Sequence, residues 1–382
     1  MLHKFKKFDL SIFVILVLFM VFSTFLVYSA TLHDPKIEFN LEKTIIIYVL
    51  SLIAFFAACL FDYRMLVKAS PYLYITGVIL LVAVWKFGIE RYGARGWFSL
   101  PGGLDFQPVE LFKLILIITL AAYISRRKGE ALELLRDVIP IGVIVLIPFL
   151  LVVIQPDLGN AIIFISILVG MYWIGNVRLI YVLSGIVIVV GGLYLFLYLF
   201  QTYHDPITAY FESKKLGHWV ERINTFVNPD EASMDSKWQV MNSMRAIGSG
   251  GLTGEGYLAG TSIHSNFIPV AYTDAIFVVV GEEFGFVGAS LLLLMYFVLI
   301  YRMILISIYS NNYSGSYIII GIVSMLVFQI FENVGMMIGI MPLTGITLPF
   351  ISYGGTSLLI NMLAMGLVMS IRMHDDVPLE EA

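Results

Sequence analysis

One aspartate stands where a carboxylate can act as a base. Asp274 is the last ionisable residue before a long apolar stretch that begins at Ala275. Burial at such a water–lipid boundary raises the pKa of a carboxyl group, and a positioned carboxylate of this kind suits general-base catalysis. The start of a helix favours the anion instead, so Thr273 and Asp274 could also serve only as a cap. The residues alone leave base and cap as equal alternatives.

Further charged side chains lie inside or beside apolar stretches, where they are costly and usually face a cavity or one another. Glu110 and Lys113 are three residues apart and therefore share a helix face. This spacing fits a structural ion pair and a functional role equally well. Glu282 and Glu283 lie within one apolar stretch, so we expect both to face a polar interior. For Asp157, which follows a proline, capping of the next helix is favoured. Asp157 and Glu282 are also candidate residues of a substrate-binding cavity.

Glycine and proline mark the segments around these residues. Glycines in 248–256 let the backbone approach a ligand closely or turn sharply, which we favour over a flexible linker. Segment 339–357 breaks the helical pattern, and irregular backbone near membrane depth belongs inside protein or along a watery cavity. We therefore expect this segment, which includes Ser352 and Tyr353, to line a site. Small residues spaced for close helix packing occupy one stretch: Gly281, Gly285 and Gly288.

The composition places these residues in a membrane protein. The 382 residues are 59% hydrophobic and 13% charged, with a mean hydropathy of +0.90, whereas soluble domains carry about 25% charged residues. We expect an all-α integral membrane protein with about ten transmembrane helices. The predicted spans are 10–30, 44–61, 71–88, 109–125, 138–154, 160–176, 179–202, 275–303, 315–337 and 354–372.

Several classes of function are excluded. The first apolar stretch has about 20 residues, which fits an uncleaved span better than a signal peptide. Cys59 is the only cysteine, so an intramolecular disulfide and a cysteine-based metal cluster are ruled out. The sequence has no P-loop for an ATP-driven pump and no basic, aromatic pattern for nucleic acid.

The distribution of Lys and Arg predicts that both termini are cytoplasmic. Twelve of these residues fall on the side of the termini and five in the short segments of the other side. The segments 88–108, 155–159 and 338–353 and a large extracellular loop, 203–274, then face outward. We expect a single membrane domain over 1–382 with this loop packed on it. A single broken helix around 155–159 would instead reverse every later loop.

Together, the motifs resemble the SEDS family of shape, elongation, division and sporulation proteins (RodA, FtsW and SpoVE). The resemblance covers nearly the whole chain in the family's order. It is carried by 155–159, 246–252, Thr273-Asp274 with 281–285, and 342–345 with 348–355.

The resemblance implies a peptidoglycan glycosyltransferase that polymerises lipid II on the outer face of the bacterial cytoplasmic membrane. One sugar's C4 hydroxyl attacks C1 of another, and undecaprenyl diphosphate leaves. Asp274 then inherits the general-base role, while Glu110 and Lys113 match positions lining the same cavity. The family also implies a class B penicillin-binding protein as partner, together with other elongation or division machinery. A divalent cation (Mg or Mn) on the diphosphate is compatible with this chemistry, although the sequence shows no dedicated ligand set.

Some residues depart from the family pattern: Gly96, Trp238, Glu255, Val270 and Ala275. They leave the catalytic assignment intact but remove positive charge that could meet a diphosphate. Arg95, Arg222 or Arg245 could supply it instead.

Two alternatives remain from the residues. A lipid II flippase would also use broken helices and buried charges, but it needs polar groups on both faces. A scaffold for a penicillin-binding protein would not explain ionisable residues at membrane depth. The sequence does not separate an elongation, division or sporulation member.

Overall fold

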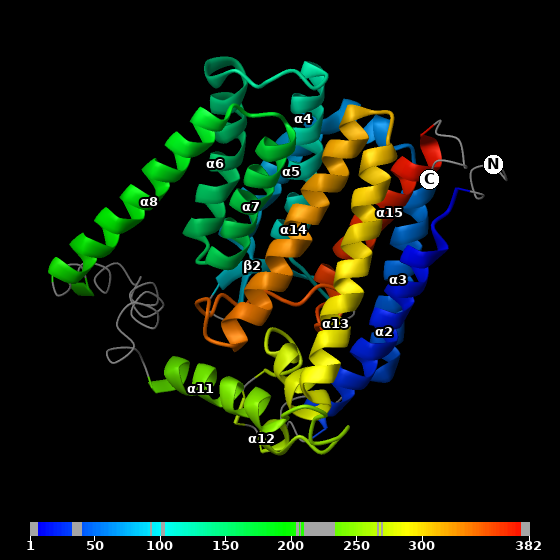
Figure 1. Cartoon of the computed structure of the whole chain (residues 1–382), viewed down its shortest axis with the longest axis vertical. Helices are drawn as coiled ribbons and strands as arrows, with labels where there is room; N and C mark the ends of the chain where they lie inside the picture. Colours follow the sequence, from blue (N-terminus) through cyan, green and yellow to red (C-terminus); the bar gives the residue numbers. More distant parts are fainter. Residues whose placement is uncertain are drawn as a thin grey trace.

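The computed structural model describes residues 7–32, 40–91, 94–100, 104–203, 206, 208–209, 234–265, 267–268 and 270–375. Helices run side by side along most of the molecule, and α11 and α12 lie at one end of the bundle (Figure 1). The elements are α2 (Leu10–Thr31), α3 (Leu41–Leu60), α4 (Tyr63–Phe87), β1 (Ile89–Arg91), β2 (Ala94–Leu100), β3 (Leu104–Phe106), α5 (Pro108–Ile124), η1 (Ser125–Arg127), η2 (Leu134–Val138), α6 (Ile139–Ile154), α7 (Leu158–Ile174), α8 (Leu179–Thr202), α11 (Met234–Ser249), α12 (Thr261–His264), α13 (Ile276–Tyr309), α14 (Tyr313–Met337) and α15 (Gly355–His374).

The prediction of a multi-pass, all-helical membrane domain is confirmed. Within the described residues, nine helices are long and apolar enough to cross a membrane, and α7 is a shorter apolar helix of 17 residues. Each predicted span corresponds to one helix. The largest difference is α4, which begins at Tyr63 because Asp62 caps it through the N–H of Arg64 at 2.9 Å. Pro71, the predicted start, lies inside this helix.

α6 and α7 are two antiparallel helices rather than one broken helix. The hydroxyl of Tyr172, near the end of α7, donates a 2.5 Å hydrogen bond to the carbonyl of Val138, at the start of α6. Between the helices, Gln155 donates through Nε2 to the carbonyl of Leu81 at 3.0 Å. The later loops therefore alternate between the two ends of the bundle as the ten-span prediction requires.

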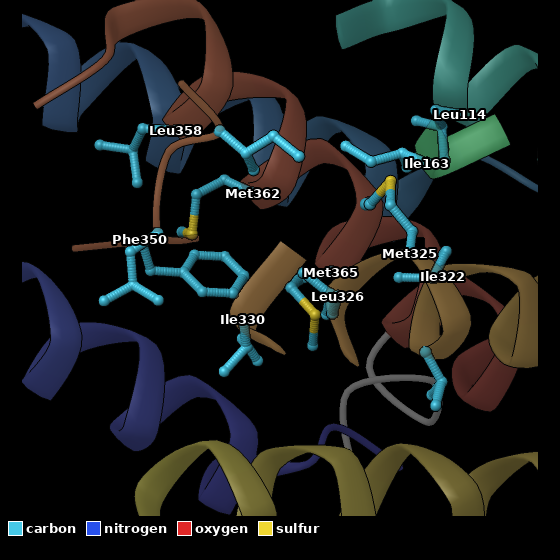
Figure 2. Packing of buried hydrophobic residues seen from close by; sticks show 14 of the residues in the cluster. Leu114, Ile163, Ile322, Met325, Leu326, Ile330, Phe350, Leu358, Met362 and Met365 are labelled. Carbon is cyan, nitrogen blue, oxygen red and sulfur yellow. The ribbon is translucent and has the colours of Figure 1, made fainter. Parts of the chain in front are cut away.

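The centre of the bundle is formed by α5, α14 and α15, the most buried of the spanning helices. Figure 2 shows Leu114 of α5, Ile163 of α7, Met325 of α14 and Met365 of α15 packed in one cluster with Phe350. By contrast, α8 leans away from the bundle (Figure 1), and none of the residues in its most apolar window is buried. The central helices can therefore hold side chains at fixed positions.

The two ends of the described chain meet at one end of the bundle (Figure 1). Asp9 caps α2 and also accepts hydrogen bonds from Arg302 of α13 and Arg372 of α15. Lys7 donates through Nζ to the main-chain carbonyl of Asp375 at 2.5 Å. The buried Asp9 carboxylate thus has two arginine partners, and these contacts, together with that of Lys7, fasten the termini to the bundle.

The opposite end holds a small three-stranded sheet, a local feature that was not predicted from the sequence. Strands β1, β2 and β3 form an antiparallel sheet in that order, with Glu90 opposite Arg95 and Ser99 opposite Asp105. The sheet connects α4 to α5. Its short strands carry too little hydrophobic alternation to be distinguished from a loop in the sequence.

The helix α13 is interrupted at Gly285, whose φ of 63° is left-handed. The loop 250–256 fills the interruption through main-chain hydrogen bonds. The N–H of Glu255 donates to the carbonyl of Glu282 at 2.9 Å, and the N–H of Phe286 donates to the carbonyl of Gly251 at 2.9 Å. The loop therefore replaces hydrogen bonds that the helix lacks at this point.

Close approach of two backbones explains the glycines of this region. A Cβ on Gly254 would lie 2.1 Å from the carbonyl oxygen of Glu283, and one on Gly285 would lie 2.4 Å from the nitrogen of Gly254. The interpretation of Gly281, Gly285 and Gly288 as a helix-packing strip is therefore wrong for Gly285. Gly281 does serve packing, because a Cβ there would lie 2.9 Å from the Ile247 side chain of α11.

Candidate functional site

Five polar side chains form a hydrogen-bonded network at the end of the bundle opposite the termini. Lys113 donates through Nζ to Glu110 Oε1 at 2.7 Å and to Asn160 Oδ1 at 3.1 Å. Asn160 donates to Asp157 Oδ2 at 2.9 Å, and Gln107 donates to the same oxygen at 3.2 Å. Because only 1% of the Lys113 side chain and 6% of that of Glu110 are exposed, this is a shielded, charge-paired network.

Two of the sequence alternatives are resolved by this network. Glu110 and Lys113 form the ion pair that their spacing allows. Asp157 caps α7 by accepting a 3.2 Å hydrogen bond from the N–H of Asn160. Burial raises the pKa of the Asp157 carboxyl, and the hydrogen bonds from Asn160 offset part of that rise.

The irregular segment 338–354 lies beside this network. A Cβ on Gly159, in the first turn of α7, would lie 2.8 Å from Cγ1 of Ile346 and 3.1 Å from Cβ of Thr344. Only a residue without a side chain lets the segment approach α7 so closely at this position. The segment is thus in direct contact with the helix that carries Asp157 and Asn160.

The two predicted cavity residues of this segment differ in exposure. Ser352 is buried, and its Oγ accepts a 2.7 Å hydrogen bond from the N–H of Leu348. Tyr353 is half-buried and donates through its N–H to the carbonyl of Tyr272 at 2.9 Å, with the two rings 6.2 Å apart. Ser352 therefore stabilises the turn, and Tyr353 joins the segment to the residues that precede α13.

Asp274 is adjacent to the same segment. Asn333 of α14 donates through Nδ2 to the main-chain carbonyls of Asp274 and Ile346, both at 2.7 Å. The Asp274 carboxylate is half-buried, and its Oδ1 accepts a 2.9 Å hydrogen bond from the hydroxyl of Thr273. A Cβ on Gly345 would lie 3.9 Å from the other oxygen, Oδ2. The carboxylate is therefore fixed in position while part of it stays accessible.

The contacts around Asp274 help to decide whether this residue is a general base or a helix cap. The N-cap of α13 is Ala275, which makes no side-chain capping bond, so neither Thr273 nor Asp274 occupies the capping position. Burial raises the pKa of the Asp274 carboxyl, and the Thr273 hydroxyl with nearby main-chain N–H groups offsets part of this rise. An accessible carboxylate with a raised pKa has the properties of a general base.

Glu282 belongs to the loop rather than to this site. Its two oxygens accept hydrogen bonds from the N–H groups of Ser262 at 2.6 Å and Ile263 at 3.2 Å, and the side chain is fully buried. The prediction that Glu282 lines the cavity is therefore wrong, because both of its oxygens anchor α12. Glu283 accepts a hydrogen bond from the hydroxyl of Ser29, so both glutamates face polar partners as expected.

The predicted cationic residues lie at the same end. Arg95, in β2, and Arg245, in α11, are exposed. Arg95 precedes Gly96, where a Cβ would lie 3.9 Å from the Gln107 amide nitrogen of the network. Arg222 lies outside the described residues.

Three residues that organise the site were not predicted from the sequence. Gln107 and Asn160 complete the network, and Asn333 holds Asp274. On the same helix as Asn333, Glu332 accepts a 2.9 Å hydrogen bond from the hydroxyl of Thr344. Polar residues recurring within the apolar span 315–337 were the available signal, since such residues usually face a protein interior.

Comparisons with known proteins agree along the whole chain. The cell cycle protein family model for FtsW, RodA and SpoVE matches residues 6–377. Stage V sporulation protein E of Bacillus subtilis is 31% identical over 371 residues, which cover 95% of this chain and 96% of that protein. Peptidoglycan glycosyltransferase MrdB of Escherichia coli is 32% identical over 380 residues, which cover 96% of this chain and 94% of that protein.

Solved structures share the fold. A chain from a peptidoglycan synthase complex, described for its coordination of polymerization and crosslinking, has a TM-score of 0.77 and 26% identity. The match covers 97% of this chain and 98% of that one. The Rod shape determining protein RodA of Thermus thermophilus has a TM-score of 0.68 and 24% identity, covering 97% and 98% of the two chains. The arrangement of helices is therefore common to all three chains.

Proposed function

This chain belongs to the FtsW, RodA and SpoVE family of cell cycle proteins and is a peptidoglycan glycosyltransferase, and we propose that it polymerises lipid II with Asp274 as general base. The position of the Asp274 carboxylate supports this role. It is half-buried, held through its neighbour Thr273 and through Asn333, and has a raised pKa. It is also adjacent to a segment in contact with the buried network of α5 and α7.

The proposed step requires one proton acceptor. The C4 hydroxyl of one disaccharide forms a bond to C1 of the next as Asp274 takes the hydroxyl proton. The bond from C1 to the diphosphate breaks, and undecaprenyl diphosphate leaves with the electron pair. Positioned general bases contribute about 10²–10⁴-fold to a rate. Orientation of the two lipids by the surrounding protein supplies further acceleration, because it removes the entropy of bringing them together.

Charge for the leaving diphosphate is proposed to come from exposed arginines. Lys113 is buried against Glu110 and is therefore not available for this role. Arg95 of β2 and Arg245 of α11 are exposed, and both elements lie toward the site's end of the bundle (Figure 1). Arg side chains bind phosphate groups through paired hydrogen bonds. Their replacement by methionine is expected to weaken lipid II binding without moving Asp274.

The described residues show no preformed protein site for a divalent cation. The Glu110 and Asp157 carboxylates already accept hydrogen bonds from Lys113, Gln107 and Asn160. Among the described residues, no group of three His, Cys, Asp or Glu side chains could hold a metal ion. The proposed steps therefore use this chain's own groups.

The chain is a multi-pass protein of the cytoplasmic membrane. We propose that the end with both termini is cytoplasmic, since Lys and Arg are concentrated there, and that the Asp274 end faces outward. We also propose that a class B penicillin-binding protein cross-links the product. The structural neighbour from a synthase complex that couples polymerization to crosslinking supports this partner.

Polymerisation of labelled lipid II by the purified full chain, with and without a class B penicillin-binding protein, tests the proposal. Glycan ladders are expected from the wild type, with a loss of at least about 10²-fold for Asp274→Asn. The matched control is Asp62→Asn, which replaces the cap of α4 at the opposite end of the bundle. Full activity of Asp274→Asn would reject the general base. Folded protein that forms no ladder under any condition would reject lipid II polymerisation and favour transport.

A further inference from the structure

Three buried oxygens on α14 have no hydrogen-bond donor within the described residues: Gln329 Oε1, Glu332 Oε2 and Asn333 Oδ1. The exposed fractions of these residues are 1%, 0% and 0%. Residues at positions i, i+3 and i+4 of a helix share one face. The central helix therefore presents one carboxylate oxygen and two amide oxygens together, and all three oxygens require a positive or hydrogen-donating partner.

The orientation of Asn333 and Glu332 is fixed by their other contacts. Asn333 uses Nδ2 for the carbonyls of Asp274 and Ile346, so exchanging its amide oxygen and nitrogen would set oxygen against two carbonyls. Glu332 accepts the Thr344 hydroxyl through Oε1. Both side chains therefore face the segment that runs past Asp274.

An uncompensated carboxylate in this position is unfavourable. Buried charges in proteins are paired with an opposite charge or bind a metal, because their removal from water is unfavourable. Glu110 has Lys113 as its partner, but no Lys, Arg or His in the described part of the chain forms a salt bridge with Glu332. A cation bound between these oxygens would supply the partner that the described residues lack.

We propose that Gln329, Glu332 and Asn333 bind a sodium ion beside the 342–348 segment. Oxygen ligands suit hard cations rather than zinc or copper. One carboxylate neutralises one positive charge, whereas a divalent ion would leave net charge in a buried position. Magnesium also requires near-octahedral geometry and usually retains several waters, which this apolar helix surface does not favour.

The bound ion would act on the site through Asn333. Coordination of Oδ1 polarises the amide and strengthens the hydrogen bonds that Nδ2 donates to Asp274 and Ile346. Glu332 is then a positioning residue, since it holds the ion and Thr344 rather than touching substrate. This effect on catalysis rests on the proposed function, whereas ion binding itself does not.

Binding is tested on the purified full chain without substrate. Scintillation proximity with radioactive sodium is expected to show about one saturable site per chain. The unfolding temperature should rise with sodium chloride relative to choline chloride at equal ionic strength, because a ligand that binds the folded state stabilises it. Glu332→Gln should lose both effects, and Gln329→Leu should weaken sodium affinity. The matched control is Glu283→Gln, which removes a buried glutamate of α13 and should keep both effects.

Polymerisation with sodium or choline then measures the coupling. Sodium should raise kcat of the wild type more than it lowers KM, and it should have no effect on Glu332→Gln. Absence of sodium binding to the wild type, with equal unfolding temperatures in both salts, would overturn the site. Equal sodium stabilisation of wild type and Glu332→Gln would overturn its assignment to Glu332. Neither result depends on the glycosyltransferase activity.

Discussion

The side-chain amide of Asn333 donates a 2.7 Å hydrogen bond to the main-chain carbonyl of Asp274. The same nitrogen donates to the carbonyl of Ile346. One side chain in a central, buried helix therefore joins the loop before α13 to the irregular segment 338–354. The proposed base is held by the scaffold through its backbone, which leaves its carboxylate available.

Replacement of Asn333 by alanine should impair catalysis through misplacement of Asp274. A displacement of about 1 Å costs about 10²-fold in rate, so we expect a fall in kcat of that order for lipid II polymerisation. The control is Asn312→Ala on the same helix, which removes an N-cap at the other end and should lower stability but not rate. Equal effects of the two variants on kcat would contradict the positioning role.

The rate should depend on pH through the Asp274 carboxyl. Burial raises its pKa, and only the anion accepts a proton, so activity is lost as pH falls through a value above the usual aspartate range of about 3.9. Thr273→Val removes a hydrogen bond that stabilises the anion. The acid limb of kcat against pH should therefore move to higher pH. The control is Thr119→Val, whose hydroxyl donates to the carbonyl of Ile115 within α5 and which should leave the acid limb unchanged. If the acid limb also stays in place for Thr273→Val, Asp274 is not the group whose titration produces it.

The spans were predictable from sequence because lipid imposes a length and an apolar composition on each helix. Only the predicted start of α4 differs substantially from the observed start, because Arg64 and Lys68 lower the hydropathy of its first turns. The interruption at Gly285 was not predictable. It depends on hydrogen bonds to residues 251–256, which are about 30 positions distant in the sequence.

The site was predictable where its contacts are local. The Glu110–Lys113 pair follows from a spacing of three residues, and the Asp157 cap follows from its place before α7. The contact of Asn333 with Asp274 joins residues 59 positions apart. The partners of the buried Glu282 carboxylate are main-chain N–H groups of α12, about 20 positions earlier, so its role could not be predicted from local spacing.

The ion pair of Glu110 and Lys113 should matter more for stability than for charge in the cavity. Lys113→Met leaves the buried Glu110 carboxylate without its partner, and breaking such a pair costs about 3–5 kcal/mol. Thermal unfolding in detergent should show a large decrease for this variant. The double variant Glu110→Gln/Lys113→Met should recover much of the loss, because no charge remains buried. The exposed Arg136, replaced by Met, should change the unfolding temperature little; a double variant no more stable than Lys113→Met would contradict the charge argument.

Gly285→Ala should release the 250–256 loop from α13. An alanine at φ 63° is strained, and its Cβ would lie 2.4 Å from the nitrogen of Gly254. A strained conformation of this kind costs about 1–3 kcal/mol, which the loop can relieve by leaving the interruption. We therefore expect faster proteolysis between α11 and α12, a lower unfolding temperature and weaker polymerisation. The control is Gly191→Ala in α8, where a Cβ meets no atom within 4 Å.

Comparison of Gly285→Ala with Gly191→Ala distinguishes loss of loop attachment from a general effect of replacing a helical glycine. Both lie in spanning helices, but only Gly285 has a left-handed backbone and a loop packed against it. Alanine favours helix over glycine by about 1 kcal/mol, so Gly191→Ala should be neutral or slightly stabilising. If Gly285→Ala behaves in the same way and its loop keeps its protection from protease, the hydrogen bonds of 251–256 are not what holds α13 in its interrupted form. If Gly285→Ala loses its protection from protease while Gly191→Ala keeps it, the loop and the helix that begins beside Asp274 stabilise each other.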